Sequence, residues 1–169
     1  MRKYIYILIS SISLISVLGF TTSHFKKNTC KAAPLMADMK EKQIQQNLIT
    51  GNGLFQDLTK DHASNDLRVA NIQLAPKSYL HWHSLPGGRV IIVTDGEGFY
   101  QSKGKDVVKL KKGDTIETTP GLYHWLGSSP NGKMEFISIS TQKSEELVNW
   151  HESLSVAEYD QAVKSSNIS

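Results

Sequence analysis

The chain has 169 residues, of which 39% are hydrophobic and 21% are charged, and this composition is typical of one globular domain with appendages. It has one cysteine, which excludes an intramolecular disulfide framework and a multi-cysteine zinc module. The net charge of +3 is unevenly distributed along the chain, because the first 31 residues carry five of the 19 basic residues and no acidic one. The remainder has 14 basic against 16 acidic residues, so the composition argues against a nucleic-acid partner.

Residues 1–23 have the pattern of a signal peptide. Two basic residues precede the uncharged, apolar residues 4–20, and small polar residues 21–23 offer a cleavage site. The alternative is an uncleaved anchor formed by residues 4–20, because three lysines follow soon after that stretch. We therefore predict an exported protein, periplasmic or secreted, or alternatively one that is held at a membrane by residues 4–20.

Residues 24–49 are predicted to form a linker that contains a short helix. Apolar residues in Pro34–Leu48 recur with helical spacing, which favours a helix outside the main domain or a linker without fixed structure.

Residues 50–142 are predicted to form an all-β domain. Six apolar segments have the length of strands, and glycine-rich or proline-rich turns, including Asp95–Gly98, separate them. Short strands without intervening helices predict a sandwich or a barrel. The predicted strands are 67–74, 89–94, 99–102, 107–110, 115–118 and 134–140.

Residues 143–169 are predicted to form a helical tail. Leu147, Trp150 and Leu154 have the spacing of one helical face. The segment Ser155–Glu158 has the pattern of a capping box, which predicts that a last short helix begins there and ends near Lys164.

Three histidines of the β region are candidate metal ligands. His81, His83 and Leu85 alternate, so on a strand all three side chains would lie on one face. His124 follows about forty residues later, after another turn. Two histidines on one strand with a distant third are a workable ligand set for a divalent metal inside a barrel. The alternative for such a pair is a solvated strand end.

Two segments resemble the motifs of the cupin domain. Residues His81–Arg89, followed by Gly96, resemble the first motif, Gly-x5-His-x-His-x3,4-Glu-x6-Gly. The second motif, Gly-x5-Pro-x-Gly-x2-His-x3-Asn, is matched at three positions and differs at two. The matches are Gly113, Gly121 and His124, and Thr119 and Ser128 stand in place of Pro and Asn.

The resemblance extends over about residues 50–160 and is closest to small exported cupins, such as those similar to hydroxynitrile lyases or of carboxymuconolactone-decarboxylase type. It implies a double-stranded β-helix, or jelly roll, here with short N-terminal and C-terminal helices. It also implies small-molecule chemistry or binding. Cupins include lyases, isomerases, dioxygenases and binding proteins without catalysis, so the fold does not fix the reaction.

The register of the resemblance decides which residues could hold a metal. When the first motif is fixed by Gly96, the four ligand positions of the family fall on His83, Leu85, Arg89 and His124. Leucine cannot coordinate a metal, and arginine is a permanent cation without a lone pair to donate. A shifted set of His81, His83 and His124 would restore three ligands for one Mn, Fe, Ni or Zn ion.

Three interpretations of the pocket follow from these residues. In the first, it binds one divalent metal through His83, His124 and His81. In the second, it holds no metal, and Arg89 binds a small anionic ligand through paired hydrogen bonds. In the third, the pocket is a filled core, and Arg89 points to solvent or pairs with an acid such as Glu97 or Glu117.

The predicted function is therefore that of a metal-dependent lyase, isomerase or oxygenase acting on a small oxygenated molecule. In it, His81 would be the general-base candidate, if it is not a ligand, and Arg89 would orient a substrate carboxylate. The alternative is a metal-free cupin that binds a small anion through Arg89 without catalysis. Association into a homodimer through edge strands is a further expectation.

Overall fold

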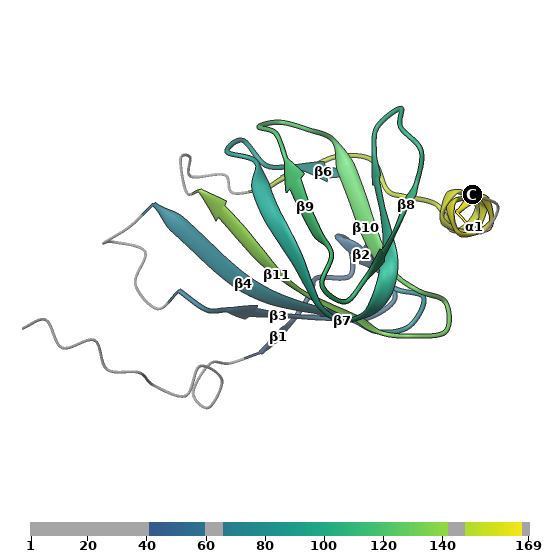
Figure 1. Cartoon of the computed structure of the whole chain (residues 1–169), viewed down its shortest axis with the longest axis horizontal. Helices are drawn as coiled ribbons and strands as arrows, with labels where there is room; N and C mark the ends of the chain where they lie inside the picture. Colours follow the sequence, from purple (N-terminus) through teal and green to yellow (C-terminus); the bar gives the residue numbers. More distant parts are fainter. Residues whose placement is uncertain (1–40, 60–65, 142–147, 167–169) are drawn as a thin grey trace, which may run out of the picture. The chain divides into compact units, whose positions relative to one another are not determined.

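The computed structural model of the chain describes residues 41–59, 66–141 and 148–166 (Figure 1). The predicted leader and the alternative anchor at 4–20 lie outside these residues, as does most of the predicted linker. Within the described ranges, no helix has the length and apolar character needed to cross a membrane.

The described chain folds as an antiparallel jelly roll with one helix, which confirms the all-β prediction (Figure 1). The strands are β1 (Lys42–Gln43), β2 (Ile49–Thr50), β3 (Gly53–Asp57), β4 (Leu67–Leu74), β5 (Tyr79–Leu80), β6 (His83–Ser84), β7 (Arg89–Ser102), β8 (Val108–Lys111), β9 (Thr115–Thr118), β10 (His124–Ser128), β11 (Met134–Thr141) and β12 (Asn149–Trp150), and the helix is α1 (Val156–Ser165).

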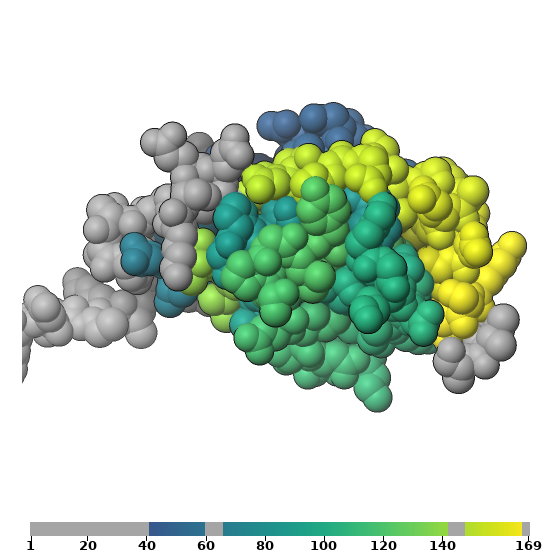
Figure 2. Space-filling view, turned by 90° about the horizontal axis from the view of Figure 1, so that it is seen from above, coloured from purple at the N-terminus to yellow at the C-terminus, as the bar shows by residue number. Residues whose placement is uncertain are grey.

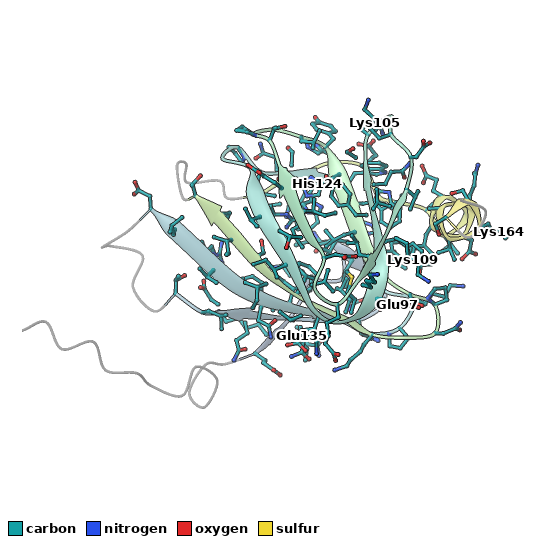
Figure 3. All side chains as sticks on the ribbon, viewed as in Figure 1. Glu97, Lys105, Lys109, His124, Glu135 and Lys164 are labelled. Carbon is teal, nitrogen blue, oxygen red and sulfur yellow. The ribbon has the colours of Figure 1, made fainter. Side chains whose placement is uncertain are left out.

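Strand β7 joins the two halves of the curled sheet. Its first half pairs with β11 and β9, and its second half pairs with β10 and β8. The strand order along the sheet is β1-β3-β4-β11-β7-β10-β5-β2, and β6 pairs with both β10 and β12. This topology brings the start of β7 and strands β6 and β10 around one interior. Figure 3 shows His124 inside this curl, whereas Lys105 and Lys164 project from the surface.

The predicted turn at Asp95–Gly98 is wrong, because the two strands expected around it form the single strand β7. Gly96 has a positive φ of 73°, and the pairing with β11 shifts by one residue between Glu135 and Phe136. A Cβ atom at Gly96 would collide with the carbonyl oxygen of Lys133. The glycine therefore serves a β-bulge that bends one strand rather than a turn that ends it.

The predicted helix over Pro34–Leu48 is wrong where it can be checked, because residues 41–48 form β1 and a turn. Strand β1 pairs with β3, and the amide of Ile44 donates to the carbonyl of Gly53 at 2.9 Å. An isolated short helix is only marginally stable in water, so this segment is more stable when it pairs with the edge of the existing sheet. Ile44 packs against the main hydrophobic core from this strand segment.

The predicted helix around Leu147–Leu154 is also wrong in its described part. Asn149–Trp150 forms β12, which pairs with β6 and places Trp150 opposite His83. The pairing with β6 therefore outweighs the helical spacing of the apolar residues in this segment. Trp150 instead packs against the core that the curled sheet encloses.

Helix α1 begins and ends as predicted. Ser155 is its N-cap, and the reciprocal hydrogen bonds between Ser155 and Glu158 form a capping box. Tyr159 is fully buried, stacks on Tyr79 with ring centroids 4.4 Å apart and donates to the carbonyl of Ser128 at 2.7 Å. The helix thus covers a second apolar cluster on the outside of the sheet. Figure 2 shows residues 148–166, in yellow, lying against the strands, in green.

Candidate functional site

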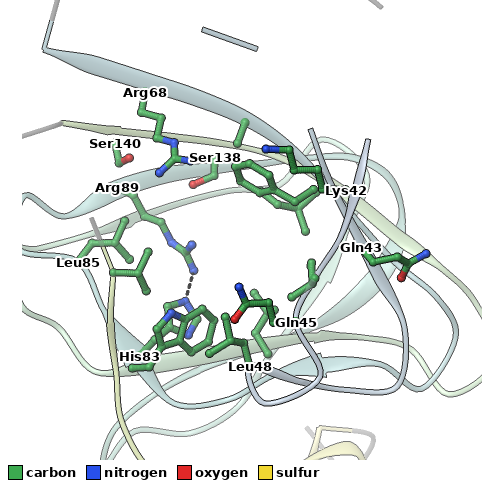
Figure 4. Close-up of a pocket in the computed structure, with 17 residues that line it drawn as sticks. Lys42, Gln43, Gln45, Leu48, Arg68, His83, Leu85, Arg89, Ser138 and Ser140 are labelled. Atoms are coloured by element: carbon green, nitrogen blue, oxygen red, sulfur yellow. Dashed lines mark hydrogen bonds between the residues drawn. The ribbon is translucent and has the colours of Figure 1, made fainter. Parts of the chain in front are cut away.

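Three of the predicted site residues meet inside the curled sheet. His83 in β6 and His124 in β10 are direct cross-strand partners, and their ring centroids lie 4.5 Å apart. Arg89 begins β7 and extends its guanidinium toward them, and Figure 4 shows its contact with His83. Its Nη2 atom lies 2.8 Å from Nε2 of His83 and 2.7 Å from Nε2 of His124. One guanidinium nitrogen therefore bridges both imidazoles.

The backbone fixes the tautomer of each imidazole. Nδ1 of His83 lies 2.7 Å from the carbonyl oxygen of His81, and Nδ1 of His124 lies 2.8 Å from the carbonyl oxygen of Leu122. A carbonyl oxygen can only accept, so both Nδ1 atoms carry a hydrogen, and a guanidinium can only donate, so both Nε2 atoms carry a lone pair. Nη2 of Arg89 has two hydrogens and donates one to each lone pair. These four hydrogen bonds are therefore mutually consistent.

Burial sets the charge of the cluster. His83, His124 and Arg89 are 1%, 0% and 8% exposed. Burial lowers the pKa of His83 well below its usual value, and the adjacent Arg89 cation lowers it further. The same two causes, in the same order, lower the pKa of His124 to about 3. Burial also lowers the pKa of Arg89 to about 10, so at neutral pH the cluster holds one cation and two neutral imidazoles.

Arg89 has no acidic partner in the described chain. Its backbone amide donates to Oγ1 of Thr118 at 2.9 Å, while its side-chain Nε is buried without a hydrogen-bond partner among the described residues. Glu97, one acid that the third interpretation pairs with Arg89, instead forms an ion pair with Lys109 at 3.3 Å. The expectation that Arg89 points to solvent is therefore wrong, since the residue is buried.

A cavity of about 380 Å³ opens beside Arg89, so the interior is not a filled core as the third interpretation expects (Figure 4). This volume is at the lower end of the range for small-molecule sites. Most of the wall is apolar. The described lining residues are Lys42, Gln43, Ile44, Gln45, Leu48, Phe55, Arg68, Ala70, Ile72, Leu80, His83, Leu85, Arg89, Ser138, Ser140, Val148 and Trp150.

The charged groups that line the cavity all have the same sign. They are Lys42, Arg68 and Arg89, and the described lining contains no Asp or Glu. Nε of Arg68 forms an ion pair with Asp57 at 3.3 Å, which leaves Arg89 as the buried lining cation without a carboxylate partner in the described chain. Ser138 and Ser140 of β11 add hydroxyl groups at the same wall. The cavity therefore combines apolar walls with a positive end.

His81 does not join the cluster. Strand β5 ends at Leu80 and β6 begins at His83, so the prediction that His81 and His83 share a face of one strand is wrong. Nδ1 of His81 accepts a hydrogen bond from the amide of Leu154 at 3.3 Å, and His81 is absent from the cavity lining. The roles predicted for His81, as a metal ligand and as a general base, stay predictions.

The comparisons with known proteins agree with this architecture. A family model described as the cupin domain matches residues 71–140. An (R)-mandelonitrile lyase from Granulicella tundricola is 31% identical over 90 residues, which are 53% of this chain and 69% of the relative. This chain belongs to the cupin superfamily. That membership confirms the family predicted from the two histidine motifs.

Two solved structures from Thermotoga maritima show how far the similarity to this cupin extends. One is described as a cupin-like protein; it is 36% identical, has a TM-score of 0.69, and the match covers 72% of this chain and 92% of that one. The other is described as a predicted oxalate decarboxylase; it is 25% identical, with a TM-score of 0.56 and coverages of 62% and 93%. These similarities extend the relationship beyond the length of the family model.

The site residues of this cupin do not fit the divalent metal that the family resemblance implies. A histidine ligand binds a metal through a lone pair, and the Nε2 lone pairs of His83 and His124 both accept hydrogen bonds from Arg89. A metal between them would also lie against the buried guanidinium cation. The described residues contain no group of three or more His, Cys, Asp or Glu that could hold a metal.

Sequence reasoning named Arg89, His83 and His124 but missed most of the cavity. Lys42 and Phe55 come from strands that were not predicted, and Arg68 comes from a predicted strand without any functional signal. Trp150 was predicted to lie on a tail helix. Its aromatic character was the one available signal, because large aromatic side chains often line ligand sites.

Proposed function

We propose that this cupin binds a small organic carboxylate in the cavity beside Arg89, without a metal. The observation that supports this proposal is the buried guanidinium of Arg89, which has two neutral histidines and no acid as partners in the described chain. A buried charge is costly unless it is paired. A carboxylate ligand would supply the missing counter-charge and accept the hydrogen of the unpartnered Nε.

The rest of the cavity defines the kind of carboxylate. Lys42 and Arg68 extend the positive character of the wall, and the hydroxyl groups of Ser138 and Ser140 can hydrogen-bond a polar substituent. Phe55 and further apolar residues form most of the lining. The ligand class is thus a monocarboxylate with a compact apolar or aromatic body. Because the leader pattern of residues 1–23 supports export, we propose that the ligand is met outside the cytoplasm.

A matched pair of probes tests the proposal. Mandelate and mandelamide share one carbon skeleton, but only mandelate is an anion at neutral pH. We expect mandelate to bind at least about tenfold more tightly in isothermal titration, because only the carboxylate supplies a negative charge to pair with the Arg89 cation. The preference should shrink as salt is added, though less than for a surface site. Equal affinity for the two probes, or a preference for mandelamide, would contradict the proposal.

The mandelonitrile lyase relative supports a second candidate function, which is lyase chemistry in the same cavity. In the cleavage of mandelonitrile, the hydroxyl group loses its proton and the bond to the nitrile carbon breaks. The electron pair of that bond leaves with cyanide, cyanide takes up the proton, and benzaldehyde forms. The Arg89 cation would stabilise the negative charge that develops on cyanide.

The lyase candidate predicts release of benzaldehyde from mandelonitrile above the uncatalysed rate. We expect this rate to be unchanged by EDTA, because Arg89 and not a metal supplies the positive charge. The formation of benzaldehyde is followed by its absorbance, with protein-free buffer and an Arg89→Leu variant as controls. Turnover that stops on adding EDTA would contradict a metal-free lyase. Absence of turnover would overturn the lyase candidate and leave the binding proposal standing.

A further inference from the structure

We infer that Nη2 of Arg89 occupies the position that a divalent metal would take between His83 and His124, so that the chain supplies its own cation there. The inference rests on three atoms. Nη2 lies within 2.8 Å of both Nε2 atoms, and those two atoms come from directly paired positions on neighbouring strands. The lone pairs of both imidazoles therefore converge on one point, and a positively charged group stands at that point.

The two imidazoles are held in the state that a metal requires. Each is a neutral ring whose Nδ1–H donates to a backbone carbonyl, and this arrangement also orients histidines that ligate metals. A metal bound by histidine nitrogens lies about 2.0–2.1 Å from them, which is less than 1 Å closer than Nη2 lies now. Apart from Arg89 itself, nothing in the described geometry of the cluster excludes an ion.

Arg89 competes with any metal because its side chain is positively charged and because it is covalently part of the chain. An incoming ion would have to displace a buried cation that is covalently tied to β7 and is 8% exposed. Leu85 lines the cavity without a donor atom and so offers an ion no ligand in exchange. We therefore expect the wild-type chain to leave divalent ions unbound at this site, although its histidines are arranged for them.

A single substitution should allow a metal to bind between the two histidines. In Arg89→Glu, a carboxylate oxygen replaces Nε at the same number of bonds from the backbone. Nε and Nη2 of a guanidinium are about 2.3 Å apart, from two C–N bonds of about 1.33 Å. An ion at the present position of Nη2 would thus lie close to the distance of about 2.0–2.2 Å at which carboxylates ligate zinc. The variant would offer two nitrogens and one oxygen, and the permanent cation would be gone.

The test is titration with Co²⁺, whose visible spectrum reports its coordination. The proteins are wild type, Arg89→Glu, Arg89→Gln, His124→Ala and the double variant Arg89→Glu/His124→Ala, all purified without a histidine tag. We expect less than about a tenth of an equivalent of tightly bound Co²⁺ in wild type and about one equivalent in Arg89→Glu. Arg89→Gln should bind Co²⁺ more weakly than Arg89→Glu, because an amide oxygen carries no charge. The double variant should lose the site.

Two results would overturn the inference. One is about one equivalent of Co²⁺ in wild type that is lost in His124→Ala, because the metal would then displace Arg89. The other is a folded Arg89→Glu protein, by circular dichroism, that binds no Co²⁺. If Arg89→Glu fails to fold, Arg89→Gln and the wild-type titration still decide between these outcomes. Failure of mandelate binding is a separate readout and would leave the Co²⁺ result unaffected.

Discussion

Replacing Arg89 by leucine is expected to weaken mandelate binding by at least about 100-fold, which corresponds to about 2.7 kcal/mol. The substitution removes the buried guanidinium, and with it the charge and the donors that would hold the ligand carboxylate. Leucine fills much of the same space without a charge, and replacing a buried charge by an apolar group is often tolerated. The measurement is isothermal titration of each protein with mandelate, after circular dichroism has shown that the variant is folded.

Arg68→Leu is the matched control for this prediction. Arg68 lines the same cavity, but it forms an ion pair with Asp57 at 3.3 Å and its side chain is 25% exposed. A partly exposed, paired cation contributes less to ligand binding than a buried one that lacks an acidic partner in the described chain. We therefore expect a loss of no more than about tenfold in Arg68→Leu. An equal loss in both variants, or an unchanged affinity in Arg89→Leu, would contradict the role proposed for Arg89.

The stability of the protein is expected to fall steeply as the pH drops from 6 to 5. The pKa values of His83 and His124 are both lower in the folded protein than in the unfolded chain, mainly because of burial. Below about pH 6.5 the unfolded chain therefore binds protons that the folded protein does not. Each histidine contributes a slope of about 1.4 kcal/mol per pH unit, so the two together approach about 3 kcal/mol per unit. For His124 the loss continues until the pH reaches its folded pKa of about 3.

Urea denaturation at a series of pH values measures this slope. Exposed carboxylates such as Asp95 and Glu152 interfere little between pH 6 and 5, because their pKa values are lowered and they titrate at more acidic pH. His124→Asn should remove about one of the protons taken up on unfolding, which reduces the slope by about 1.4 kcal/mol per pH unit, whatever its effect on absolute stability. A wild-type free energy of unfolding that is flat between pH 6 and 5 would show that the imidazoles are not held neutral.

The elements that the sequence predicted well are those with strong local signals. Helix α1 begins at its capping box, and strands β4 and β9 have the predicted bounds, because apolar alternation and turn residues define them. The short strands β1 and β12 have no such signal. They exist because strands of the sheet are available to pair with, although the apolar residues in the segments around them have helical spacing. Tertiary pairing of this kind cannot be predicted from a local pattern.

The candidate site was predictable in its members but not in its arrangement. The motif spacing singled out His83, Arg89 and His124, and the structure brings all three together. Arg89 begins β7, where its backbone amide donates to Thr118, and no sequence pattern encodes that tertiary contact. His81 was grouped with His83 on the assumption of a continuous strand, and the break between β5 and β6 separates them.

The central claim is that the guanidinium of Arg89 donates hydrogen bonds to two neutral imidazoles in place of a metal. The most direct test is ¹⁵N NMR of the histidine side chains in uniformly labelled wild-type protein at neutral pH, with and without added Zn²⁺. The account predicts that His83 and His124 both have a protonated Nδ1 and an unprotonated Nε2, with chemical shifts that Zn²⁺ leaves unchanged. An imidazolium at either position, or a shift of both Nε2 signals to the range of metal-bound nitrogen, would contradict it.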